Sequence, residues 1–170
     1  SGDTRLLLNI SGPKPSGDVS GASTVATTAK RDFDLSSLFQ VLDDQSFVAN
    51  REKEGIGIDP ASWKSVGAEG VVKGDVSVRG SQTHVELRLY VVARGSTEVL
   101  KREYDVPASG VRTATHQFAN DVVKYFTGAS GSFGTRLVYS ATTAKGQKGV
   151  FSVESDGQGI SKLPSATSVA

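Results

Sequence analysis

The residues whose types could support chemistry in this chain are two histidines, a pair of adjacent aspartates and a set of regularly spaced glycines. His84 and His116 are the only histidines among the 170 residues, and neither has a second histidine at metal-ligand spacing. His84 falls on the polar face of an expected strand, and His116 lies on an expected helix away from its apolar stripe. We therefore expect both on the solvated surface. A hydrolase that depends on either histidine is the third of three functional hypotheses.

The aspartate and glycine patterns also favour structural roles. Asp43 and Asp44 are adjacent, so in a strand their side chains would point to opposite faces, and a turn or strand end is the better interpretation. Gly128, Gly131 and Gly134 recur every three residues, which matches neither the dinucleotide fingerprint nor the P-loop. The serine-centred nucleophile elbow is absent as well. We predict no catalysis, no metal and no cofactor.

The balance of charges narrows the class of partner. Nineteen Lys and Arg residues against eighteen Asp and Glu residues give a formal net charge of +1. Nucleic acids and anionic membranes normally select a basic surface, so neither is expected as the main partner. No apolar run reaches the roughly 20 residues of a membrane span, so we predict no membrane insertion. The chain has no cysteine, which excludes disulfides and thiolate metal sites.

The first elements along the chain are an apolar strand and an amphipathic helix. Residues 5–10 form a compact apolar run suited to a buried strand, and residues 11–21 are rich in proline and glycine and read as a loop. Apolar side chains at helical spacing predict a helix over about 22–39, which must rely on packing because its threonines lower helix propensity. Residues 39–44 then read as a short strand.

A short helix follows an irregular, charged excursion over residues 47–58. Asp59 can accept hydrogen bonds at a helix N-cap, and Pro60 is preset for the first helical turn. Trp63, the only tryptophan, is predicted to anchor this helix in the core, and Gly67 is predicted to end it.

Three strands form the clearest pattern in the sequence. Apolar and polar residues alternate over residues 72–78, again over 84–91, and a third strand is expected over 98–106. A period of two with one apolar face predicts an antiparallel meander covered on one side. The helix expected over about 109–126, which ends at Thr127-Gly128, is the predicted cover. Spacing alone leaves several strand orders open.

The C-terminal residues 137–170 differ in kind from the rest. They contain two or three short strands, and so small a sheet buries too little apolar area to be stable alone. Either this tail packs on the first domain or it belongs to something larger. We expect it to be the least stable part of a monomer; its exposed strand edges are where chains could exchange or pair.

Five segments carry a further signal: DFDLSSLFQVLDD (32–44), WKSVGAEGVVKGDVSV (63–78), VELRLYVV (85–92), HQFANDVVKYFTG (116–128) and GSFGTRLVYS (131–140). They resemble the TolB family, whose order and spacing the chain follows from about residue 5 to residue 163. The resemblance implies an α/β domain of the α+β type: a mixed β-sheet with two main helices and one short helix packed on it. It further implies an N-terminal tail (1–4), this α/β domain (5–128), a connector (129–136) and the incomplete first blade of a β-propeller (137–170), with a blade turn at residues 155–157.

The resemblance also implies a function. TolB proteins are periplasmic, non-enzymatic components of the Tol-Pal system, which supports outer-membrane integrity, cell division and protein or bacteriocin transport. In the family, the N-terminal part contacts TolA and the propeller binds Pal. The family's TolA segment precedes the first strand, where this sequence has only residues 1–4, so the resemblance implies either a lost contact or one that is shifted onto the strand itself. The residues implied are Asp3, Thr4, Arg5, Leu6, Leu7, Leu8, Asn9 and Ile10.

The second hypothesis is a periplasmic module that binds a small ligand. Its pocket would lie between the sheet and a helix, and Trp63 and Tyr90 would line it. A binding module and a protein adaptor both agree with the lack of a catalytic constellation, so this alternative stays open at the level of sequence.

Overall fold

The structure is a computed structural model that describes residues 7–43, 51–129, 131, 133–134, 136–142, 146, 148–154 and 161–162. Two units are distinguished, Ser1–Gly131 and Ser132–Ala170, and each is treated by itself. Some expected features lie outside the described residues: the first four predicted contact residues (3–6), Asp44, and the expected blade turn at 155–157.

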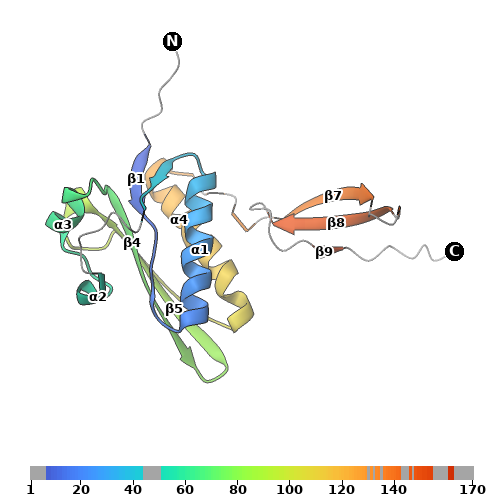
Figure 1. The fold of residues 1–170 in the computed structure, drawn as a ribbon, viewed down its shortest axis with the longest axis horizontal. Coiled ribbons are helices and arrows are strands. Elements are labelled where there is room, and N and C mark those ends of the chain that lie inside the picture. Colours follow the sequence, from blue (N-terminus) through green and yellow to red (C-terminus); the bar gives the residue numbers. More distant parts are fainter. Residues whose placement is uncertain are drawn as a thin grey trace, which may run out of the picture. The chain divides into compact units, whose positions relative to one another are not determined.

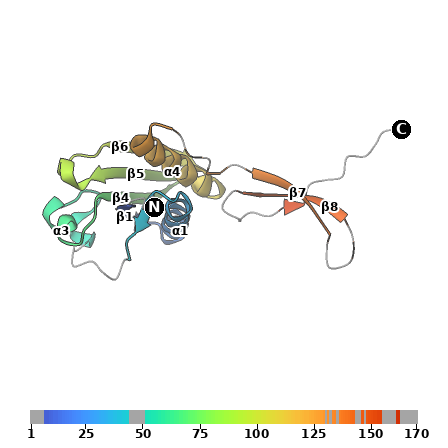
Figure 2. The ribbon, with the colours of Figure 1, turned by 90° about the horizontal axis from the view of Figure 1, so that it is seen from above.

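The first unit is built on a mixed β-sheet with the strand order β3-β1-β4-β5-β6 (Figures 1 and 2). Strand β1 runs parallel to both of its neighbours, β3 and β4, whereas β4, β5 and β6 form the predicted antiparallel meander. Strand β2 also pairs with β4; because β5 occupies the opposite side of β4 along its whole length, β2 lies on the same side as β1. The strands are β1 (Leu8–Ser11), β2 (Ser16–Gly17), β3 (Phe39–Val41), β4 (Gly70–Arg79), β5 (Gln82–Val91) and β6 (Leu100–Val106).

Two long helices, α1 (Val19–Leu35) and α4 (Val111–Thr127), lie side by side and cover one face of this sheet (Figure 1). A Cβ atom on Gly21 of α1 would lie 2.7 Å from Cγ1 of Val76, so the helix backbone packs directly on β4. The aromatic rings of Phe39 and Phe126 meet edge to face with their centroids 5.6 Å apart. Helix α4 therefore covers the sheet as predicted, and α1 covers the same face.

The ends of the two helices follow from their terminal residues. Asp18 caps α1, because its Oδ2 accepts a hydrogen bond from the amide of Gly21 at 2.8 Å. This cap starts the helix at Val19, earlier than the predicted residue 22, and the helix ends at Leu35 rather than near 39. Helix α4 ends at Gly128 as predicted, where φ is +79° and a residue with a Cβ would be strained.

The opposite face of the sheet is covered at one end by the short helices α2 (Arg51–Glu54) and α3 (Pro60–Ser65). The prediction of a single covered face is therefore wrong for this end of the sheet, because odd-numbered residues of β4 and even-numbered residues of β5 pack against α3. Trp63 has no exposed surface, which confirms it as a core anchor. The buried cluster on this face comprises Trp63, Ala68, Val71, Tyr90 and Val92.

The loop predicted over residues 11–21 is only partly irregular, because it contains the short strand β2 and the start of α1. Two 3-10 turns, η2 (Val92–Arg94) and η3 (Ala108–Gly110), connect the later elements. None of the helices in the described ranges is long and apolar enough to cross a membrane.

The second unit contains an antiparallel sheet in the order β7-β8-β9. Its strands are β7 (Arg136–Thr142), β8 (Lys148–Glu154) and β9 (Ser161–Lys162). The expected two or three strands are thus present. The longest pairing joins β7 to β8 in a continuous register from Arg136 opposite Glu154 to Thr142 opposite Lys148.

Candidate functional site: the start of strand β1 and a pocket beside strand β4

His116 is buried, so the prediction of a solvated surface position is wrong. Its side chain is 3% exposed, and its Nδ1 lies 2.6 Å from Oδ2 of Asp32, whose side chain is fully buried. The two residues belong to α4 and α1, so the pair links the helices that cover the sheet. The imidazole sits away from the apolar stripe of α4, as predicted, but that side of the helix faces α1 rather than water.

His84 is also buried, at 8% exposure, although it does lie on the predicted polar face of its strand. Its Nδ1 is 2.7 Å from Oδ1 of Asp105, and its Nε2 is 3.4 Å from Oε1 of Glu103. Both carboxylates come from β6 and cover the imidazole, while they stay largely exposed themselves. Cross-strand partners explain the burial without a catalytic role, and the described residues contain no cluster suited to a metal ion.

The described part of the predicted protein contact is the beginning of β1. Leu7 is 40% exposed, Leu8 and Asn9 are half-buried, and Ile10 is fully buried. The sequence predicts one continuous contact, whereas the four residues of it that the structure describes differ in exposure: Leu7 is the most exposed of them, and Ile10 belongs to the core.

Hydrogen bonds hold both sides of β1 from Leu8 onward. The amide of Leu8 donates to the carbonyl of Leu38 at 3.0 Å, beside β3. On the β4 side, the backbone amide of Asn9 donates to Oε2 of Glu69 at 2.8 Å. The side-chain Nδ2 of Asn9 donates to the carbonyl of Gly67 at 3.1 Å. Because β1 is an internal strand, its backbone offers no free edge for a further strand.

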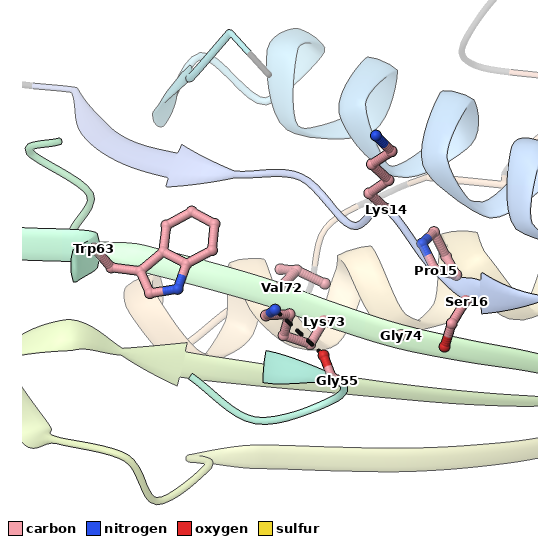
Figure 3. Close-up of a pocket in the computed structure, with 8 residues that line it drawn as sticks. All are labelled: Lys14, Pro15, Ser16, Gly55, Trp63, Val72, Lys73 and Gly74. Carbon is pink, nitrogen blue, oxygen red and sulfur yellow. Dashed lines mark hydrogen bonds between the residues drawn. The ribbon is translucent and has the colours of Figure 1, made fainter. Parts of the chain in front are cut away.

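A pocket of about 280 Å³ opens beside β4, next to the segment that joins β1 to β2 (Figure 3). Pockets for drug-sized ligands usually exceed about 300 Å³, so this one suits a small group. The sequence predicted a pocket lined by Trp63 but not the wall made by the segment between β1 and β2, because that wall depends on how β1 and β2 are registered on β4. The lining residues are Lys14, Pro15, Ser16, Gly55, Trp63, Val72, Lys73 and Gly74.

Lys73 makes one wall of the pocket and is held by α2. Its Nζ lies 2.8 Å from Oε2 of Glu54. The same Nζ donates to the carbonyl of Gly55 at 3.3 Å (Figure 3) and stands 5.7 Å from the ring centre of Trp63. The side chains of Lys73 and Glu54 are 8% and 11% exposed, so this ion pair is nearly buried. A cation over an aromatic ring and beside a carboxylate is well stabilised.

The carboxylate of Glu54 is the centre of this cluster. Burial by itself raises the pKa of Glu54, but hydrogen bonds from Lys73, from the Asp59 amide and from the Trp63 indole outweigh burial and hold that pKa below its ordinary value. Both Oε atoms accept from Nε1 of Trp63 at 3.1 Å. Glu54 is therefore ionised and fixed, and it orients Lys73 along the pocket.

Of the two predicted ligand-lining residues, Trp63 lines this pocket and Tyr90 does not. Tyr90 lies in the buried cluster, where its hydroxyl donates to the carbonyl of Ile56 at 2.7 Å. Its hydrogen-bonding capacity is used to fix the loop after α2.

Comparison with known proteins gives consistent matches. Residues 2–97 match the family described as the TolB amino-terminal domain. The chain is similar to the Tol-Pal system protein TolB of Syntrophotalea carbinolica, at 31% identity over 141 residues, which is 81% of this chain and 32% of that protein. The protein of the same name from Anaeromyxobacter dehalogenans strain 2CP-1 is 35% identical over 136 residues, 78% of this chain and 31% of that protein.

A crystal structure of TolB from Acinetobacter baumannii has the same fold. It superposes with a TM-score of 0.75 at 21% identity, over 92% of this chain and 38% of that chain. The sequence described here thus spans about a third of the length of the curated relatives it matches.

Proposed function

The chain belongs to the TolB amino-terminal domain family, and from that membership we propose that it is a non-enzymatic adaptor of the Tol-Pal system in the periplasm. Its proposed role is to contact TolA. This contact supports outer-membrane integrity, cell division and protein or bacteriocin transport. The curated relatives named Tol-Pal system protein TolB support the assignment of this chain to that system. Contact with Pal is assigned to the propeller that the family carries after this domain.

The observation that carries the TolA contact is the position of β1. The strand is internal and hydrogen-bonded on both sides from Leu8 onward, and Leu7 is the exposed residue that leads into it. The contact is therefore narrowed to residues 3–7, with Leu8 to Ile10 as its anchor in the sheet. A partner that binds the residues before β1 is held by a strand that cannot leave without opening the core.

The same proposal assigns the rest of the chain. Residues 5–128 are the α/β domain, 129–136 the connector, and 137–170 the opening strands of the first propeller blade. Support comes from the division of the chain at Gly131 and from the antiparallel order β7-β8-β9, since a blade is an antiparallel sheet.

Calorimetric titration with the C-terminal domain of TolA tests the contact. The chain is compared with a variant in which residues 3–7 are replaced by alternating glycine and serine. We expect the replacement to weaken binding at least about tenfold, because about 1.4 kcal/mol of lost contact suffices for that change. Leu35→Ser, which changes an exposed leucine at the end of α1, serves as the matched control and should bind like the unchanged chain. Equal affinity for the replaced and unchanged chains would overturn the assignment.

The second candidate function, a small-ligand module, is favoured by the pocket beside β4. Its size limits the ligand to a small group, and its lysines favour an anion. A thermal-shift screen of small anions checks this candidate; the absence of any saturable stabilisation would remove it.

A further inference from the structure

The pocket lies at a gap in the pairing of β4. Strand β1 pairs with β4 at Gly70 and Val71, and β2 pairs with it at Asp75 and Val76. Residues 72–74, which lie between these two ladders, have no register partner on that side, and all three line the pocket. The pocket is thus a place where the sheet lacks part of a neighbouring strand.

Backbone groups of β4 point into this gap. Val72 is opposite Leu89 in the β4–β5 ladder, and the carbonyl of Leu89 accepts from the amide of Val99 at 2.8 Å, on the β6 side. Residues that face each other across an antiparallel pair direct their backbone groups either toward each other or away from each other. Val72 therefore directs its N–H and C=O away from β5, and Gly74, two residues further on, does the same.

The chain opposite the gap cannot complete the ladder itself. It reads Gly12-Pro13-Lys14-Pro15, and the two prolines have no N–H to donate. This segment instead passes around the gap, with Lys14 exposed and Pro15 in the pocket wall. The sequence thus keeps the gap open rather than filling it.

The shape of the gap selects an occupant. Both ends are closed by the β1 and β2 ladders, so an extended chain cannot run through it as an added strand. A chain end can enter, and about 280 Å³ leaves room for one or two residues.

The charges select which chain end enters. Lys14 makes no ion pair with any residue that the structure describes, and the Lys73 ammonium has three N–H donors, of which two are engaged by Glu54 and Gly55. Glu54 balances the charge of Lys73, so the excess positive charge beside the pocket is that of Lys14. This charge repels a charged N-terminus and attracts a carboxylate.

We infer that this gap beside β4 binds the C-terminal end of a peptide chain. The α-carboxylate meets Lys14 and Lys73, and the last amide of the peptide pairs with the backbone of Val72 and Gly74. This combines capture of a terminal carboxylate with main-chain pairing to a short unpaired stretch of β4, and each main-chain hydrogen bond adds to affinity without demanding one sequence. The site is separate from the residues before β1 proposed to contact TolA.

The test is an NMR titration of the ¹⁵N-labelled chain with N-acetyl-glycyl-leucine. The free acid should give saturable shifts of the amides of residues 72–74 and of the Trp63 indole, with millimolar affinity, because few groups are engaged. The same dipeptide with a C-terminal amide should bind at least about tenfold more weakly, since it lacks the charge-assisted bonds. Free leucine, which carries a positive amine, separates capture of a peptide end from capture of an amino acid and should also bind more weakly.

Lys14→Gln is the informative variant, because Lys14 is exposed and its loss leaves the packing of the sheet unchanged. This variant should bind the free-acid dipeptide about threefold more weakly or worse. Its affinities for the acid and for the amide should therefore lie closer together. Lys124→Gln, an equally exposed lysine in the last turn of α4, should leave both affinities unchanged. The inference is overturned if the free acid gives no saturable shifts, if the amide binds as well as the acid, or if the shifts lie outside the pocket.

Discussion

Each face of the sheet has an acid–base pair with both side chains nearly buried, and the two pairs differ in their surroundings. Under α1 and α4, Asp32 and His116 are 0% and 3% exposed and join one long helix to the other. Under α2, Glu54 and Lys73 are 11% and 8% exposed and join a one-turn helix to the sheet. Lys73 lines the pocket beside β4, whereas Asp32 and His116 do not.

This difference separates a structural role from a binding role. A pair that no solute reaches can only fix the packing of its helices. A pair at a pocket wall also presents a charge to whatever enters. The candidate site for a ligand is therefore the face with the smaller helices, although the better-buried histidine lies on the other face.

The largest expected effect comes from breaking the sealed pair. Asp32→Ala leaves His116 buried without its carboxylate, and removing one partner of a buried pair costs about 3–5 kcal/mol. Chemical denaturation followed by circular dichroism measures this loss. Asp34→Ala, an exposed aspartate on the same helix, is the control and should stay within about 0.5 kcal/mol. A loss below about 1 kcal/mol for Asp32→Ala would mean that this face does not depend on the pair.

A smaller loss is expected when the pair at the pocket is broken. Lys73→Met keeps most of the side-chain volume but leaves the Glu54 carboxylate with only neutral donors, which costs about 1–3 kcal/mol. The loss is smaller than for Asp32→Ala because Glu54 keeps the hydrogen bonds from the Asp59 amide and the Trp63 indole. The double variant with Glu54→Gln should recover part of it, and a double variant that is less stable than either single one would contradict the coupling.

The pH dependence sharpens the same contrast. Because the pKa of Glu54 is lower in the folded chain than its ordinary value of 4.5, its contribution to stability is present above about pH 4.5 and is lost as the pH falls through the folded pKa. The stability advantage of the unchanged chain over Glu54→Gln should therefore shrink on acidification. Denaturation curves of both proteins between about pH 6 and 3 measure it. An advantage that grows on acidification would contradict the direction of the shift.

The smallest effect is expected at the exposed rim of the helical face. Nε of Arg102 in β6 lies 3.1 Å from Oδ2 of Asp121 in α4, with the two side chains 43% and 35% exposed. Exposed pairs of this kind contribute about 0–1 kcal/mol, so Arg102→Ala should lower stability by no more than that. The difference should diminish in high salt. A loss as large as that of Asp32→Ala would show that exposure does not separate the pairs.

Local patterns predicted the parts of the fold that depend on neighbours in sequence. Alternation at residues 72–78 and 84–91 predicted β4 and β5, and Thr127-Gly128 predicted the end of α4. Trp63 was placed in the core because a short helix depends on a large side chain to hold it against the sheet. These predictions were possible because the period of a strand or helix can be recognised from residues that are close together in the sequence.

What the sequence could not predict depends on pairs distant in the chain. Asp32 and His116 are 84 positions apart, and a polar residue beside an apolar stripe reads as exposed until the neighbouring helix is known. The pocket depends on the separate registers of β1 and β2 on β4. Pro13 and Pro15 were the available signal, since two alternate prolines between a strand and a helix mark backbone that cannot complete a ladder.

The central claim, contact with TolA through the residues before β1, is tested most directly by an NMR titration of the labelled chain with the TolA C-terminal domain. The account predicts shifts at residues 3–8 and at Leu38, whose carbonyl accepts from the Leu8 amide, with the Trp63 indole and the His116 ring unchanged. Shifts centred on another surface, or none at all from a folded chain, would contradict it and remove the contact from this domain.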